Sequence, residues 1–299
     1  MNYDYFSKVS VLDFARLALD VYHDPKDREL LRKEFNPLWQ KIDEWPRKAV
    51  FQHSFLNVGP GGTTHGKMNG SRETDPKTGF YASFYRNMAT DVGVLVIRGT
   101  DSIMDGIEDY HYATNLHVDQ YAQASTFWHI IKDYYLITDA KKLYICGHSL
   151  GGIIAKMIAP ITGADTIAFN SSGVTEYLKN NHLQCQRASY DQVVVTYCAN
   201  GDPVGNLNHV GDISEYRFLS VLGEEKMSDL FDKIEPNQIE NSIQKMKQGL
   251  YNHSKKEIIE AYNSLPEYDQ LAITNKMKYH SMNIMYKALK DSIYKNNYI

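Results

Sequence analysis

The 299-residue sequence has few cysteines and no long apolar segment. Its three cysteines, Cys146, Cys185 and Cys198, are odd in number and lack C-x-x-C spacing, so we expect buried free thiols. The longest apolar runs, such as residues 92–97, are far shorter than the roughly 20 residues that cross a bilayer. These absences argue against a disulfide framework, a cysteine-based metal site and a membrane-spanning chain.

Neither sign of charge is in large excess. Lysine and arginine number 32 against 36 aspartate and glutamate, a net charge of -4 that offers no general attraction for nucleic acid. The first 17 residues carry Asp4 and Asp13 and lack the basic-then-apolar order of a cleavable signal peptide. We therefore expect no nucleic-acid partner, at most peripheral membrane contact, and the cytoplasm as the default location. A protein that is exported without a cleavable signal would have the same kind of amino terminus, so signal-independent export stays possible. The sequence indicates no protein partner.

Strand-like and helix-like patterns alternate along most of the chain, which predicts an α/β fold. The two strands at residues 80–86 and 92–97 are joined by a short turn, as in a hairpin. We expect a mostly parallel central sheet flanked by helices. The predicted helices are residues 9–22, 120–135 and 152–161, and the other predicted strands are residues 143–146, 166–169, 192–198 and 215–221.

The carboxyl-terminal part differs in composition from the rest. Residues 224–275 are rich in lysine, glutamate, asparagine and glutamine at helical spacing, which predicts extra helices with a solvated face. A final helix is expected after His280, with apolar residues that can pack on the core. We expect one domain spanning residues 1–299, with residues 224–275 as a helical insertion.

The stretch YICGHSLGGIIA, residues 144–155, places Ser149 between an apolar strand and a helix. Gly147 and Gly151 permit the sharp turn between them, because side chains there would collide with the backbone. Such a turn presents the serine at the carboxyl end of the sheet beside helix amides, which suits a nucleophile. A bare G-x-S-x-G occurs by chance in roughly one such chain in ten, so the assignment depends on partner residues elsewhere.

A serine nucleophile needs a histidine base and an acid that orients it, and in α/β-hydrolases both follow the serine in the chain. Asp202 follows an apolar strand, at the edge of the sheet where ligands bind. Its alternative role is to start a turn before Pro203. Three histidines come after Asp202: we favour His280 as the base, keep His209 as the alternative, and give His253 the least weight.

Acyl transfer also requires two donors for the oxyanion of the tetrahedral intermediate. The Leu150 amide directly follows the nucleophile and is the expected first donor. Thr100, in IRGTDS after the second hairpin strand, can offer an amide and a hydroxyl as the second donor, although this segment can also be a plain strand end. This chemistry requires no metal and no organic cofactor.

Three sequence blocks, GHSLGG at 147–152, RGTDS at 98–102 and NGDPVG at 200–205, resemble the signature of the class 3 lipase family, the fungal-lipase-like branch of the α/β-hydrolases. The resemblance implies a triad of Ser149, Asp202 and His280, an oxyanion hole of Thr100 and the Leu150 amide, and a lid after Thr100. The sequence departs from the family in two places. Gly106 stands where a tryptophan is common, and 78 residues separate Asp202 from His280.

The resemblance implies a serine carboxylic ester hydrolase, lipase-like or phospholipase-like, that acts on acyl lipids or small esters through an acyl-enzyme. Two alternatives stay open. An acyltransferase or thioesterase would use the same triad with another acceptor or leaving group. A catalytically inactive scaffold protein would keep the hydrolase fold and use residues 224–275 as its working surface.

Overall fold

The computed structural model describes residues 9–22, 38–46, 78–99, 103–135, 143–200, 202, 204–205, 210–219 and 280–296. The segment 224–275 lies outside the described residues. The expectation of one domain with a helical insertion therefore stays a prediction.

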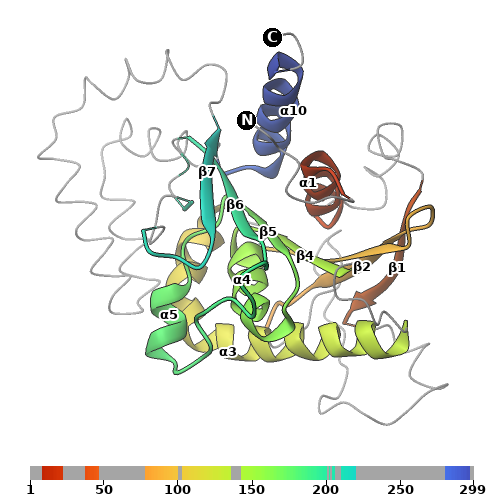
Figure 1. Ribbon diagram of the computed structural model, residues 1–299. Helices are drawn as coiled ribbons and strands as arrows, with labels where there is room; N and C mark the ends of the chain where they lie inside the picture. The colour runs from red at the N-terminus through yellow and green to blue at the C-terminus, as the bar shows by residue number, and fades with distance from the viewer. Residues whose placement is uncertain are drawn as a thin grey trace, which may run out of the picture.

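A seven-stranded sheet forms the centre of the described structure, with its strands in chain order (Figure 1). The first three strands are antiparallel, and the four pairings from the third strand to the seventh are parallel. The expected α/β architecture, a mostly parallel central sheet flanked by helices, is confirmed. The strands are β1 (Trp39–Trp45), β2 (Ala82–Asn87), β3 (Val92–Ile97), β4 (Leu143–His148), β5 (Thr166–Phe169), β6 (Val194–Ala199) and β7 (Glu215–Leu219).

Three helices connect the parallel strands and cover one face of the sheet: α3 (Ile103–Tyr134), α4 (Leu150–Thr162) and α5 (Thr175–Asn180). This follows from topology, because right-handed crossovers between parallel strands in sequential order all pass over the same face. The opposite face is covered by α1 (Val11–Asp20) and α10 (Met282–Asn296), which come from the two ends of the described chain (Figure 1).

Side chains of β3 show how the two apolar layers divide. Val94 and Val96 pack with α1 and α10, whereas Leu95 and Ile97 pack with α3 and α4. Successive side chains of a β-strand point to opposite faces of the sheet, which explains this alternation. Because β3 is buried on both faces, its sequence is a continuous apolar run.

The two end helices are also joined directly. The Arg16 Nε of α1 donates to the Tyr286 hydroxyl of α10 at 2.9 Å, and the Arg16 guanidinium lies 5.7 Å from the Tyr286 ring centre. At the start of α1, the Asp13 amide donates to the Ser10 hydroxyl at 3.1 Å, the capping contact that the sequence predicts. The beginning of α10 is thus fixed against the same face as α1.

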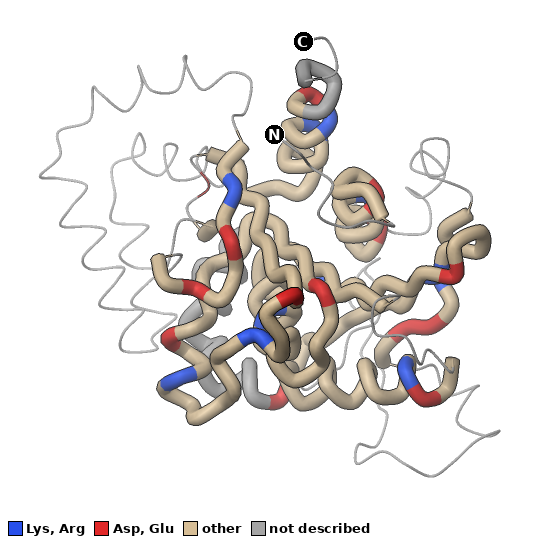
Figure 2. Tube along the Cα trace, viewed as in Figure 1, with Lys and Arg blue, Asp and Glu red and all other residues tan. Residues whose placement is uncertain are grey.

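Two cysteines, Cys146 in β4 and Cys198 in β6, are buried, Cys185 is partly exposed, and all three are free thiols. Within the described ranges, every helix is too short or too polar to pass through a membrane. Basic and acidic residues are interspersed over the described trace (Figure 2).

Two described elements are absent from the sequence prediction. The strand β1, WQKIDEW, is an edge strand whose polar residues do not stand out from a loop. The helix α5 has only six residues, too few for a periodic pattern. A third difference is α3, which begins at Ile103 instead of residue 120.

Candidate active site

Ser149 stands at the turn between β4 and α4 with φ 56° and ψ -127°. A non-glycine residue at such a φ is strained and persists only where its surroundings impose it. Here the close approach of backbone imposes it. A Cβ on Gly147 would collide with the Gly151 carbonyl oxygen. A Cβ on Gly151 would collide with the Ile97 carbonyl oxygen. The structure therefore has the sharp strand-to-helix turn that the two glycines predict.

Hydrogen bonds hold the turn on both sides. The Ser149 amide donates to the Phe169 carbonyl of β5 at 2.9 Å, and the Ser149 carbonyl accepts from the Gly152 and Ile153 amides at 2.9 and 3.1 Å. The helix α4 thus begins at once after the serine. Leu150 is its first residue, so its amide has no acceptor within the helix and lies at the positive end of the helix dipole.

Ser149, His280 and Asp202 are buried and joined in a row. The Ser149 Oγ lies 2.6 Å from His280 Nε2, and His280 Nδ1 lies 2.9 Å from Asp202 Oδ1. A carboxylate only accepts hydrogen bonds, so Nδ1 carries the imidazole proton and Nε2 is left to accept from the serine hydroxyl. The structure brings these three predicted residues together with the bonding order of a nucleophile, a base and an orienting acid.

Asp202 is held at the carboxyl end of β6 by its own turn. Its amide donates to the Ala199 carbonyl at 3.0 Å, and its carboxylate accepts from the Val204 and Gly205 amides at 3.3 and 2.8 Å. The turn considered as an alternative role for this aspartate is therefore present as well. It orients the carboxylate toward His280, so the two roles are compatible.

Two further polar residues of the site were not predicted: His148, which directly precedes the nucleophile, and Tyr22, which follows α1. His148 Nε2 lies 2.7 Å from the His280 carbonyl oxygen, and His148 Nδ1 lies 2.9 Å from the Tyr22 hydroxyl. Burial, together with the nearby His280, lowers the pKa of His148 from 6.5 to about 3. A polar residue at the end of the apolar strand β4 was the available signal for His148. Nothing local marks Tyr22.

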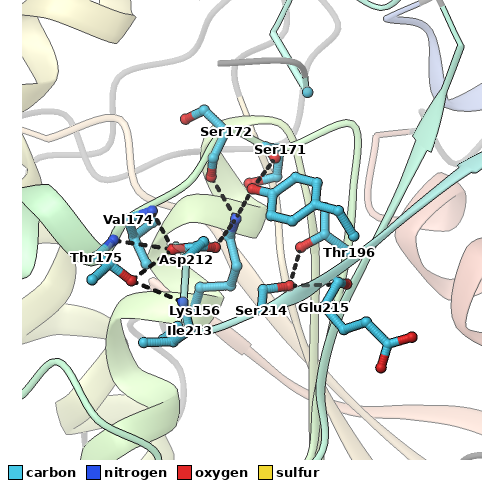
Figure 3. Close-up of polar contacts among 12 residues, drawn as sticks. Lys156, Ser171, Ser172, Val174, Thr175, Thr196, Asp212, Ile213, Ser214 and Glu215 are labelled. Carbon is cyan, nitrogen blue, oxygen red and sulfur yellow. Dashed lines mark hydrogen bonds and ion pairs between the residues drawn. The ribbon is translucent and has the colours of Figure 1, made fainter. Parts of the chain in front are cut away.

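A second buried polar cluster, also missed, surrounds Lys156 of α4 (Figure 3). Its ammonium donates to the Ser172 carbonyl, to the Tyr216 hydroxyl at 2.8 Å and to Asp212 Oδ2 at 3.3 Å. The Tyr216 hydroxyl in turn donates to the Ser171 carbonyl at 2.9 Å. Burial lowers the pKa of Lys156, and Asp212 opposes that shift. An ammonium has three N–H donors, so this set of acceptors uses all of them.

The other carboxylate oxygen of that cluster binds the start of α5. Asp212 Oδ1 accepts from the amides of Val174 and Thr175 at 2.8 and 3.0 Å and from the Thr175 hydroxyl at 3.0 Å. The cluster therefore ties α4 to the loop after β5 and to the segment before β7.

Other predicted site residues lie outside the described residues: Thr100, the alternative base His209, and His253. Gly99 is the last described residue before Thr100. In the described ranges, no group of three or more histidine, cysteine, aspartate or glutamate side chains could hold a metal ion.

Comparison with known sequences gives a family match. Residues 13–248 match the model of a phospholipase-like family, the Tle-like phospholipase domain. An extracellular phospholipase A1 of Serratia liquefaciens is 34% identical over 106 residues, which are 36% of this chain and 31% of that protein. The chain thus spans about a third of the length of this curated relative. The resemblance to lipases is confirmed at the level of the family.

Two fungal lipases are among the solved structures that this chain resembles. The Lip2 lipase of Yarrowia lipolytica is 17% identical, with a TM-score of 0.42 over 73% of this chain and 78% of that one. A lipase of Rhizopus microsporus var. chinensis is 14% identical, with a TM-score of 0.36 over 66% of this chain and 67% of that one.

Proposed function

The chain belongs to the Tle-like phospholipase family, and we propose that it is a serine carboxylic ester hydrolase that cleaves acyl esters of phospholipids through a triad of Ser149, His280 and Asp202. The observation that carries the proposal is the hydrogen-bonded row of these three buried side chains, with the serine on a strained turn. The same three side chains could catalyse any acyl transfer, so the assignment of a phospholipid substrate depends on the family match.

In the first half of the reaction, Ser149 Oγ attacks the ester carbonyl carbon while His280 Nε2 takes the hydroxyl proton. Asp202 keeps the imidazole in the required tautomer and stabilises the imidazolium that forms. The oxyanion of the tetrahedral intermediate accepts from the Leu150 amide, whose place at the start of α4 leaves it available. Thr100 stays the predicted second donor.

Collapse of that intermediate breaks the ester C–O bond. His280 gives its proton to the leaving alcohol oxygen, and the acyl group stays on Ser149. Water then attacks the acyl-enzyme with His280 as base, which releases a fatty acid and restores the serine hydroxyl. Every proton moves through one imidazole, and no metal or organic cofactor takes part.

The substrate class rests on the family description and on the relative from Serratia liquefaciens, which is called a phospholipase A1. A phospholipid substrate lies in a membrane surface, so the proposal includes peripheral contact with one. Gly106, in place of the tryptophan common in class 3 lipases, agrees with a substrate other than a fat droplet.

The proposal is tested with phosphatidylcholine that carries different acyl chains at its two positions, in mixed micelles. Mass spectrometry then identifies the fatty acid and the lysophospholipid released by the wild type, by Ser149→Ala and by Ser214→Ala. Ser214 is a matched control, since it is also a buried serine but bonds to Thr196 beside the Lys156 cluster. We expect Ser149→Ala to lose about 10⁶-fold in rate and Ser214→Ala to stay close to the wild type.

Other results would contradict the proposal in separate ways. Full activity of Ser149→Ala would remove the serine from the mechanism. Transfer of the acyl group to an added alcohol in preference to water would assign an acyltransferase. No product from any ester, together with no labelling of Ser149 by a fluorophosphonate, would favour the inactive scaffold.

A further inference from the structure

A row of hydrogen bonds links four parts of the chain beside the nucleophile. The Gly99 amide, after β3, donates to the Tyr22 hydroxyl oxygen at 2.8 Å. The Tyr22 hydroxyl lies 2.9 Å from His148 Nδ1, and His148 Nε2 lies 2.7 Å from the backbone carbonyl of His280. The row therefore runs from the loop that precedes Thr100 to the backbone of the candidate base.

The direction of each bond follows from the chemistry of its partners. A carbonyl oxygen only accepts, so His148 Nε2 carries the proton of a neutral imidazole. Nδ1 then accepts from the Tyr22 hydroxyl, whose oxygen accepts from the Gly99 amide. Burial keeps His148 uncharged, with a pKa lowered to about 3, so this order persists at neutral pH. Tyr22 and His148 therefore each accept one hydrogen bond and donate one along the row.

The row also fixes how closely the loop after β3 approaches the nucleophile. A Cβ on Gly99 would fall 2.5 Å from the Tyr22 hydroxyl, 2.5 Å from the His148 carbonyl and 3.1 Å from the Ser149 Cβ. Gly99 is therefore in backbone contact with the serine turn, and Tyr22 closes the space beside it. The Tyr22 ring also packs edge-on against His148, with ring centres 5.5 Å apart.

We propose that Tyr22 and His148 are positioning residues of the active site: they hold the His280 backbone and the Gly99 loop at fixed places around Ser149. This inference rests on the proposed function. It makes α1 a part of the catalytic apparatus, because Tyr22 enters the site from the end of that helix. It also explains why a histidine precedes the nucleophile, since this side chain bonds to the base through its carbonyl and packs on its ring at 5.0 Å.

A merely structural role predicts a different result. Tyr22 and His148 would then stabilise the fold, and their loss would lower the concentration of folded protein without changing its rate. Tyr85 offers a control: it is buried, whereas Tyr22 is partly buried, and its hydroxyl donates to Asp20, in the same helix α1. Tyr22→Phe and Tyr85→Phe each remove one hydroxyl that ties the end of α1 to the sheet layer, but only Tyr22 reaches the site.

The experiment uses the full chain and a soluble fluorophosphonate, which reports the reactivity of Ser149 without a lipid surface. The second-order labelling rate and the thermal unfolding midpoint are measured for the wild type, Ser149→Ala, Tyr22→Phe and Tyr85→Phe. We expect Tyr22→Phe to label about 10-fold more slowly and Tyr85→Phe to stay within about twofold of the wild type, with comparable shifts of midpoint. With a p-nitrophenyl ester, the loss in Tyr22→Phe should fall on kcat and leave KM unchanged.

Two results would overturn the inference while the proposed function stands: a Tyr22→Phe rate within twofold of the wild type, or an equal loss in both tyrosine variants. Absence of labelling in the wild type would instead overturn the proposed function itself.

A further pair of variants tests the bond to His280. His148→Phe keeps a ring but loses the donor, and we expect labelling to fall about 100-fold. His148→Gln keeps a side-chain N–H that can reach the His280 carbonyl, so it should recover at least fivefold over His148→Phe. Equal rates in the two variants would show that this bond positions nothing.

Discussion

Two buried aspartates of this protein are held almost alike and differ in what they hold. Asp202 accepts from the amides of Val204 and Gly205, and Asp212 accepts from the amides of Val174 and Thr175. Both side chains are fully buried. Hydrogen bonds from backbone amides fix the orientation of the carboxylate in each case.

The difference lies in the partner on the other side. Asp202 faces His280, whose second nitrogen accepts from a serine hydroxyl, so the serine proton can pass to that nitrogen. Asp212 faces Lys156, whose three protons are all used by the Ser172 carbonyl, Tyr216 and Asp212 itself. A buried, well-anchored carboxylate is thus not by itself a sign of catalysis. What separates the two aspartates is whether the partner can take up the serine proton and release it again.

The largest effects are expected when the same substitution is made at both aspartates. Asp202→Asn offers an amide that no longer fixes the His280 tautomer, so we expect kcat to fall about 10⁴-fold with a small loss of stability. Asp212→Asn should show the reverse, with a large loss of stability and nearly unchanged activity per folded molecule. Ester hydrolysis and urea unfolding, measured on both variants, check this. Similar kinetic losses in the two variants would contradict the division.

The next largest effect is expected from the cation. Lys156→Met leaves the Asp212 charge buried without its partner, so the free energy of unfolding should fall by about 3–5 kcal/mol. Replacement of both residues, as Lys156→Met with Asp212→Leu, should recover much of this, because no buried charge then remains. Urea unfolding of the single and double variants measures the difference. A double variant less stable than Lys156→Met would contradict this, and would show that Asp212 stabilises the fold without Lys156 through its bonds to the Val174 and Thr175 amides.

A smaller effect concerns pH. The folded pKa of His148, about 3, lies below its unfolded value near 6.5, so below pH 6.5 the unfolded chain binds a proton that the folded chain does not. Above pH 6.5 this group adds no pH dependence. As pH falls from 6.5 toward 3, it should lower the free energy of unfolding by about 1.4 kcal/mol per pH unit.

This pH dependence is measured by urea unfolding of the wild type and of His148→Gln between pH 7 and pH 4. The variant has no titrating group at this position, so its curve should be flatter than that of the wild type. Parallel curves would mean that His148 titrates alike in both states.

Much of the fold could be read from local pattern. Sequence pattern predicted six of the seven strands, and it is clearest for β3, β4, β5 and β6, because a strand buried on both faces must be apolar throughout. The edge strand β1 could not be found in this way. Its residues are mostly half-exposed, and pairing with β2 gives it its conformation. Likewise, α3 is longer than its apolar stripe at residues 120–135.

The residues of the candidate site and the nearby Lys156 cluster also fall into those that sequence pattern predicts and those that it does not. Gly147, Ser149 and Gly151 are close in sequence, and their steric demands act over a few residues, so the turn was predictable. Lys156 and Asp212 were not, because a lysine in a helix normally faces solvent and only the tertiary packing buries it.

By itself, the sequence determined the α/β class and the turn at Ser149, since both depend on short-range periodicity and on backbone sterics. It also limited the base to three histidines after Asp202. Only the tertiary structure brings His280 against Ser149 across 131 residues, and Tyr22 against His148 across 126. The physical reason is that both depend on how α1 and α10, from opposite ends of the described chain, pack on the face that the crossover helices leave open.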